Sequence, residues 1–444
     1  MAGRSRLIAL LAVIALLAVP ALVLRVFCIG HSCDEAARAE ARIPFCSLPQ
    51  DTRERIAAGF REGRSPDVLG VTGALSLRGG SSFGRKRPRP AWPSASGGAD
   101  AARVPLGFSG PGVRAGAALP RGATLDSVAP SIAVAIGLER PHPEVRSGEA
   151  LDAIGSDSDP RLVVEVVLKG IGSVDVERSP EAWPVLEKLL KDGASTMDAD
   201  AGSLPLDPAA ILTTIGAGAR PAQHGITGTN LRDDEGRLAR AWGPGAPVSV
   251  IATLANDLDE ELGGEPKIGL VAPDPADRGL IGGHWYVDVD RDDVVIGRRR
   301  PAPTVRSLLK RGYGRDGVPD LIAIILDGSS ADMDAELGAI REAVSNGPRP
   351  PLLVVTATGS SARPDGDGLD HRVATAWVER GFAPGDPIVE ATTPGGLFLD
   401  QRVLAREEIS EDALIDRMAR MYHSGRRVFA DVFPAIAVSF ARYC

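Results

Sequence analysis

Apolar runs and segments of helical periodicity alternate along the second half of the chain. Four runs rich in Val, Ile and Leu are typical of strands that are covered on both faces: Leu162–Leu168, Lys267–Ala272, Asp320–Leu326 and Leu352–Thr356. Between them lie four predicted helical segments, the second with a strand leading into it: Pro184–Asp192, Val248–Glu261, Thr304–Arg311 and Asp334–Ser345. This alternation predicts an α/β fold with a mostly parallel sheet sandwiched between helices.

The first part of the domain is less regular. Gln50–Arg61 and Leu125–Leu138 have the pattern of helices, and Val104–Val113 that of a strand and turn. Gly79–Gly98 is rich in Gly, Ser and Pro and is expected to be a loop. Near the other end, a strand at Gly396–Leu399 and a helix at Glu411–Met421 are predicted. The segment Val428–Phe440 is the last part of this pattern before Cys444.

The N-terminus predicts a membrane anchor. Leu7–Leu24 carries no charge and follows Arg4 and Arg6, so a spanning helix over residues 7–27 is expected, with a cytoplasmic tail at 1–6. A cleaved signal peptide is the alternative. Residues 28–45 then form a juxtamembrane spacer, and 46–444 form an extracytoplasmic domain. The predicted location is the cell membrane, with a single pass.

The cysteines fit an extracytoplasmic location, and the charge argues against nucleic acid as a partner. The four cysteines allow three pairings, and we predict a local Cys28–Cys33 bridge and a long-range Cys46–Cys444 bridge; free thiols are the alternative. The net charge is −8, and the basic stretches are short. Nucleic acid is therefore not an expected partner.

The stretch Ser203–Ile226 carries the most specific motif. It follows the strand Leu162–Leu168 and the helix Pro184–Asp192, and it closes on Gly218-Ala-Arg-Pro221 and His224-Gly-Ile226. This order resembles the opening of the alkaline phosphatase superfamily, in its type I phosphodiesterase/nucleotide pyrophosphatase branch. The resemblance implies an alkaline phosphatase-like α/β fold.

The resemblance also implies a circular permutation. Residues 46–154, with Gly63–Gly70, Val104–Val113 and Leu125–Leu138, resemble the C-terminal part of the family, whereas 161–444 resemble its N-terminal part. The polar segment 155–160 is then the linker between the old termini. A Cys46–Cys444 bridge would staple the new ends. Two separate incomplete domains are the alternative.

The resemblance further implies a damaged active centre. In the family, aspartates and histidines hold two divalent metals, and a Thr or Ser is the nucleophile. Lys169 stands at the first ligand position and Pro208, after Asp207, at the nucleophile position. Asp327 and Asp332 are the weak metal-ligand candidates that remain, and Thr358 lies in a loop without the family's ligands. A protonated lysine cannot ligate a metal; it can instead pair with the surviving acids.

One histidine has a counterpart in the family. His224 belongs to the turn after the nucleophile helix, and it is expected to pack or to form hydrogen bonds near that loop.

The functional expectation is a membrane-anchored pseudoenzyme that acts by binding or scaffolding. Its partners would be the membrane and an unknown envelope protein or a small phosphorylated ligand, and no cofactor is expected. The alternative is an active metal-dependent phosphodiesterase or phosphatase with relocated ligands, which would need two zinc or manganese ions. A purely structural role in an envelope complex is a third hypothesis.

Overall fold

The computed structural model describes most of the chain from Phe45 onward. The described residues are 45–72, 76–77, 80–81, 89–90, 99–156, 158–283, 292–297, 300–347, 349–360, 368–369, 371–382, 385–423 and 426–444. The predicted anchor at 7–27 and the predicted Cys28–Cys33 bridge lie outside them. Within the described part, no helix is long and apolar enough to cross a membrane.

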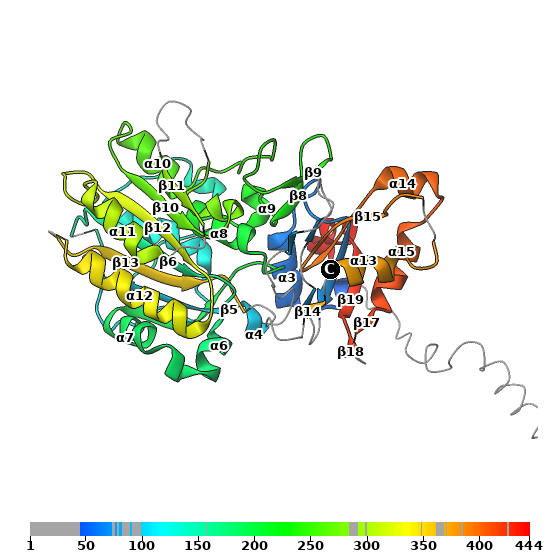
Figure 1. Cartoon of the computed structure of the whole chain (residues 1–444), viewed down its shortest axis with the longest axis horizontal. Helices are drawn as coiled ribbons and strands as arrows, with labels where there is room; N and C mark the ends of the chain where they lie inside the picture. The colour runs from blue at the N-terminus through cyan, green and yellow to red at the C-terminus, as the bar shows by residue number, and fades with distance from the viewer. Residues whose placement is uncertain are drawn as a thin grey trace, which may run out of the picture. The chain divides into compact units, whose positions relative to one another are not determined.

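A seven-stranded sheet forms the larger core (Figure 1). Its strand order is β11-β10-β12-β6-β13-β5-β7. The strands are β5 (Arg103–Ser109), β6 (Leu162–Leu168), β7 (Ala194–Asp200), β10 (Ile268–Ala272), β11 (Asp292–Ile296), β12 (Asp320–Leu326) and β13 (Leu352–Ala357). Neighbours from β11 to β13 pair in parallel, and only β5 runs against the others. The predicted mostly parallel sheet is confirmed.

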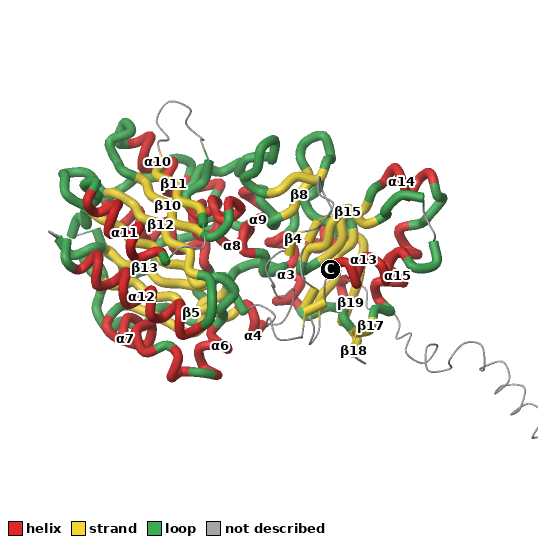
Figure 2. Tube along the Cα trace, viewed as in Figure 1, coloured by secondary structure: helices red, strands yellow, loops and turns green. Residues whose placement is uncertain are grey.

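Helices cover both faces of this sheet (Figure 2). Every residue of β6 and β12 is buried, and successive side chains of a strand point to opposite faces, so neither face is open to water. One group of neighbouring helices comprises α6 (Ser173–Arg178), α7 (Pro184–Asp192), α11 (Pro301–Lys310) and α12 (Ser330–Ser345). The other comprises α5 (Val128–Ile136), α8 (Pro208–Ala217) and α10 (Leu254–Glu261). The predicted strand before α10 is absent; Val248 and Val250 lie exposed in a loop instead.

A second sheet is antiparallel and was not predicted as a sheet, although its strand β16 (Gly396–Leu399) has the predicted bounds and the predicted helix Glu411–Met421 corresponds to α15. Its order is β19-β1-β16-β15-β3-β4, and it has an apolar core of its own with α13 (His371–Glu379), α14 (Gln401–Arg406) and α15 (Glu411–Ala419). The strands are β1 (Val68–Thr72), β3 (Gly80–Ser81), β4 (Arg89–Pro90), β15 (Val389–Thr393), β16 (Gly396–Leu399) and β19 (Phe429–Pro434).

Smaller elements complete the described chain. Three two-stranded pairs are β2 (Ser76–Leu77) with β14 (Gly368–Leu369), β8 (Asn230–Arg232) with β9 (Leu238–Arg240), and β17 (Tyr422–His423) with β18 (Arg426–Arg427). The remaining α-helices are α3 (Gln50–Gly59), α4 (Ala99–Ala102), α9 (Pro221–His224) and α16 (Ile436–Ser439). Short 3-10 helices are η1 (Phe45–Ser47), η2 (Leu125–Ser127), η3 (Pro143–Val145), η4 (Pro180–Ala182), η5 (Pro275–Leu280) and η6 (Ala441–Tyr443).

Strands from the early and late parts of the chain are interleaved. β1 lies between β16 and β19 in the second sheet, and β5 lies between β13 and β7 in the first. Residues 46–154 and 161–444 therefore share both sheets.

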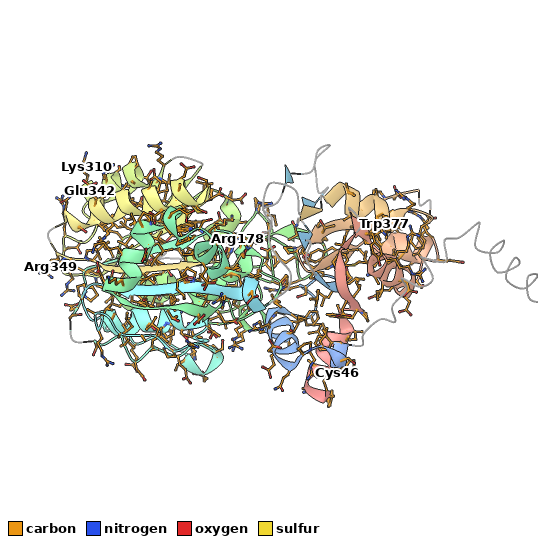
Figure 3. All side chains as sticks on the ribbon, turned by 90° about the horizontal axis from the view of Figure 1, so that it is seen from below. Cys46, Arg178, Lys310, Glu342, Arg349 and Trp377 are labelled. Carbon is orange, nitrogen blue, oxygen red and sulfur yellow. A yellow bond between two sulfur atoms is a disulfide. The ribbon has the colours of Figure 1, made fainter. Side chains whose placement is uncertain are left out.

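A disulfide joins the two ends of the described chain. Cys46 and Cys444 are bonded, with their Cα atoms 5.1 Å apart, so this predicted pairing is confirmed. Phe45 packs on Phe433 of β19 beside it, with ring centroids 5.1 Å apart. Cys46 lies where α3 meets the last segment of the chain (Figure 3).

Removing this disulfide is expected to lower stability. The double variant Cys46→Ser/Cys444→Ser frees the unfolded chain from a loop closed over a separation of 398 residues. We expect a loss of about 2–4 kcal/mol in the free energy of unfolding, because the long loop restricts the unfolded state. Urea unfolding of both proteins measures it, and the wild type under reductant should match the variant. An unchanged urea midpoint would contradict the stabilising role.

Candidate functional site

The predicted cleft begins at the carboxyl end of β6. The backbone N–H of Lys169 donates to the carbonyl of Leu326, which keeps this residue at the shared end of β6 and β12. Its ammonium Nζ lies 2.5 Å from Oδ1 of Asp277, and the two side chains are only 3% and 1% exposed. The structure thus pairs Lys169 with a buried carboxylate, but Asp277 is not one of the acids that the sequence analysis named.

Asp277 lies on η5, directly after β10. Burial raises the pKa of the Asp277 carboxyl, and the positive charge and hydrogen bond of Lys169 oppose that shift. The neighbouring Asp274 caps η5 by accepting from the N–H of Ala276 at 2.9 Å. Arg240 of β9 donates to both carboxylate oxygens of Asp274 at 2.8 Å. Although burial acts to raise the pKa of Asp274, the bonds from Arg240 and Ala276 hold it below its usual value.

Asp207 caps the helix α8. Its Oδ1 accepts from the N–H of Ala209 at 3.0 Å and from both the N–H and the hydroxyl of Thr229 at 2.8 Å. Burial raises its pKa, and these hydrogen bonds together with the charge of Lys169 oppose the rise. Pro208 takes the first position of the helix, where a missing N–H costs nothing. The pair Asp207-Pro208 is therefore a helix start, and Pro208 offers no nucleophilic atom.

Thr358 ties the ends of two strands together. Its N–H donates to the carbonyl of Leu168 at 3.1 Å, and its hydroxyl accepts from the N–H of Gly170 at 2.8 Å. Its side chain is buried beside the Lys169–Gly170 turn. The structure thus places Thr358 next to Lys169, whose positive charge also acts to lower the pKa of Asp207.

Asp327 and Asp332 lie on a different part of the cleft. Both line an open cavity of about 710 Å³ at the carboxyl ends of β10 and β12, together with Pro273, Arg300 and Glu336. Asp332 belongs to the first turn of α12, where its carboxylate accepts from the hydroxyl of Ser329 at 2.6 Å. Lys169 does not line this cavity.

These donors do not fit a pair of divalent metals. The Asp277 carboxylate is already paired with the Lys169 ammonium. Oδ1 of Asp207 accepts three hydrogen bonds, and the Thr358 hydroxyl accepts one from the Gly170 N–H. In the described part of the chain, no three His, Cys, Asp or Glu side chains gather in a metal-holding group.

His224 is buried and forms hydrogen bonds near the loop, as expected. Its ring is fully buried, Nε2 lies 3.1 Å from the Thr214 hydroxyl, and Nδ1 accepts from the N–H of Ile226 at 3.1 Å. Burial, with the nearby charges of Arg61 and Arg64, lowers its pKa to about 3. The ring therefore stays neutral and joins α8 to the turn after α9.

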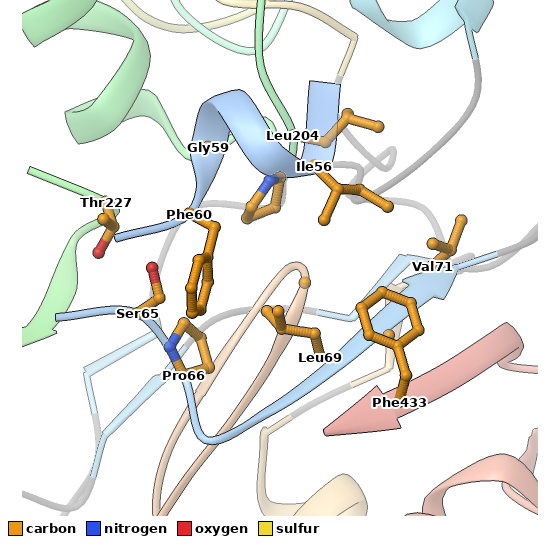
Figure 4. Close-up of a pocket in the computed structure, with 13 residues that line it drawn as sticks. Ile56, Gly59, Phe60, Ser65, Pro66, Leu69, Val71, Leu204, Thr227 and Phe433 are labelled. Atoms are coloured by element: carbon orange, nitrogen blue, oxygen red, sulfur yellow. The ribbon is translucent and has the colours of Figure 1, made fainter. Parts of the chain in front are cut away.

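A small apolar cavity lies elsewhere, between α3, β1 and β19 (Figure 4). Its volume is about 20 Å³, which is room for roughly one water molecule. Ile56, Leu69 and Phe433 supply apolar walls, and the hydroxyls of Ser65 and Thr227 are engaged in hydrogen bonds with residues 61 and 64. Nothing about this cavity indicates a ligand.

Sequence reasoning missed Asp277, Asp274 and Arg240. A signal for the two aspartates was present: Asp274-Pro-Ala-Asp277 begins two residues after the predicted strand that became β10. An acid directly before a proline, with a second acid three residues after the first, marks the start of a helix. In α/β proteins, ligand and catalytic sites form at the carboxyl ends of the strands. Arg240 had no comparable signal, since β9 is a three-residue strand of a separate hairpin.

Comparison with known proteins assigns no family. The chain matches no protein-family model and no curated protein. Among solved structures it is similar to a wild-type alkaline phosphatase, PafA, with 14% identity over 59% of this chain and 76% of that chain and a TM-score of 0.41. That degree of likeness is too low to define what this chain is.

Proposed function

We propose that the protein is a membrane-anchored, extracytoplasmic pseudoenzyme with an alkaline phosphatase-like fold. The observation that carries the proposal is the buried pair of Lys169 and Asp277 at the carboxyl end of the central strand β6. In an open α/β sheet, this end is where a catalytic centre is expected. An ammonium there supplies the positive charge that the carboxylates need and repels an incoming dication. Binding or scaffolding is then the role left to the domain.

The proposal includes the circular permutation. Its support is the interleaving of early and late strands in both sheets and the bond between Cys46 and Cys444. Two separate domains would each need a complete sheet of their own, because an incomplete sheet exposes unpaired strand edges. Strands from one would then not be expected to fill the sheets of the other. The partner is an envelope protein or a small phosphorylated ligand.

An active metal-dependent phosphodiesterase is the second candidate. The open cavity lined by Asp327, Asp332 and Glu336 favours it, because relocated carboxylates could serve a metal there.

Metal analysis and a diester assay separate the two candidates. For the purified full chain, after incubation with zinc or manganese and desalting, we expect less than one metal ion per chain. We also expect no turnover of bis(4-nitrophenyl) phosphate above that of the Asp327→Asn/Asp332→Asn variant. Two tightly held ions, with turnover that a chelator abolishes and the double variant lacks, would establish the enzyme instead.

A further inference from the structure

Three exposed apolar side chains gather at the C-terminal end of the described chain. Ile436, Phe440 and Tyr443 are 54%, 54% and 70% exposed. They account for three of the nine large hydrophobic residues that are exposed among the described residues, and for both aromatic ones. Their spacing of four and three residues along α16 and η6 puts them on one side of this helical path. We refer to these three residues as the C-terminal apolar face.

The C-terminal apolar face is fixed to the start of the domain. Cys444 is bonded to Cys46, and both α16 and η6 pack against α3. The rings of Phe440 and Tyr443 lie 6.3 Å apart, and the Arg442 guanidinium lies 4.8 Å from the Tyr443 ring centroid. The face is therefore a pre-formed surface and not a loose tail.

The length of chain before Cys46 limits what can cover this face. The predicted span ends at residue 27, so the spacer 28–45 can reach at most about 60 Å when fully extended. A tether this short keeps a weakly binding surface at a high local concentration relative to its target. The nearest large apolar target for a tethered domain is the membrane itself.

We propose that the C-terminal apolar face docks onto the bilayer–water interface beside the anchor; this inference rests on the anchor in the proposed function. Tyr and Phe rings with a flanking arginine suit that interface, where the apolar body enters the acyl boundary and polar tips meet the headgroups. The helix α3 next to it carries acidic and basic side chains in equal number, Asp51 and Glu54 with Arg53 and Arg55, and Asp51 is paired with Arg55 at 3.0 Å. Binding therefore depends on apolar burial, and a zwitterionic bilayer is the partner.

Brominated lipids test the docking directly, because bromine quenches tryptophan that enters the acyl region. The full chain carrying Phe440→Trp is reconstituted in vesicles of phosphatidylcholine with brominated or ordinary acyl chains. The matched control is Ile296→Trp, a 39% exposed position on β11 at the edge of the seven-stranded sheet. We expect about twofold stronger quenching for Phe440→Trp than for the control, and its loss when Ile436→Ser and Tyr443→Ser are added.

The outcomes separate this inference from the anchor. Vesicle flotation reports the anchor: a full chain that does not float with lipid removes the anchor from the proposed function, and the docking with it. If the chain floats but the Phe440→Trp and Ile296→Trp variants are quenched equally, the docking is refuted and the anchor is retained. A dimer in light scattering, abolished by the same serine substitutions and without lipid quenching, would show that a second copy covers the face.

Discussion

Replacing Lys169 by alanine is expected to lower the free energy of unfolding by about 3–5 kcal/mol, the range for breaking a buried ion pair. The Asp277 carboxylate, only 1% exposed, would lose the ammonium that lies 2.5 Å away. Burying a charge without a partner costs far more than a surface ion pair contributes. Urea unfolding followed by circular dichroism measures the change.

Two further variants decide how the pair acts. Lys169→Met with Asp277→Leu removes both charges, and most of the lost stability should return, because well-packed apolar residues often replace a buried pair without cost. Lys188→Ala breaks the exposed pair with Asp192 and should change stability by less than about 1 kcal/mol. If Lys169→Ala were as mild as Lys188→Ala, the cleft would be open to water and the pseudoenzyme argument would lose its main support.

Glu165 is expected to make the stability of the protein fall between about pH 5 and pH 8. It lies in the middle of β6, is 2% exposed, and its Oε1 has no hydrogen-bond partner among the described residues. Burial raises the pKa of its carboxyl to about 8. The unfolded chain, with an ordinary pKa near 4.3, releases the proton first as the pH rises. The folded state is therefore favoured at low pH, and this contribution is lost by about 1.4 kcal/mol per pH unit through that window.

The variant Glu165→Gln removes the titration. Urea unfolding at pH 5 and pH 8.5 should show similar stability for the two proteins at pH 5 and a more stable variant at pH 8.5, by up to about 4 kcal/mol. Glu342→Gln, at an exposed position of α12, serves as the control and should leave the pH dependence unchanged. Parallel pH profiles for wild type and Glu165→Gln would show that Glu165 finds a partner or water in solution.

Much of the larger sheet could be predicted because its signals are local. β6 and β12 coincide with their predicted ranges, since a continuous run of buried β-branched and leucine residues has few alternatives. The helix α7 also has the predicted bounds, set by Pro184 at its start and Gly193 after its end.

Of the second sheet, the strand β16 was predicted with its observed bounds, but the sheet itself was not, because it is held by distant contacts. β1 pairs with β16 and β19, more than 300 residues away along the chain, and β3 and β4 are two residues long. Short strands among Gly, Ser and Pro residues have no periodicity of their own. Their pairing depends on partners that sequence spacing alone does not identify.

In the candidate site too, the local features could be predicted from the sequence and the long-range contact could not. The Asp207-Pro208 helix start is a local pattern, and so is the end of β6 at Lys169. The partnership of Lys169 with Asp277 joins residues 108 positions apart through the packing of η5 against α8. Only the folded chain reveals which carboxylate neutralises the lysine.

The bond between Cys46 and Cys444 makes the domain a covalent ring. A protease that cuts once within any loop of this ring opens it but releases no fragment, so the pieces separate only after reduction. A mechanical force applied at Cys46 is likewise transmitted directly to Cys444. The paired strands β1 and β19, which follow Cys46 and precede Cys444 in the chain, are then loaded together and not separated one after the other.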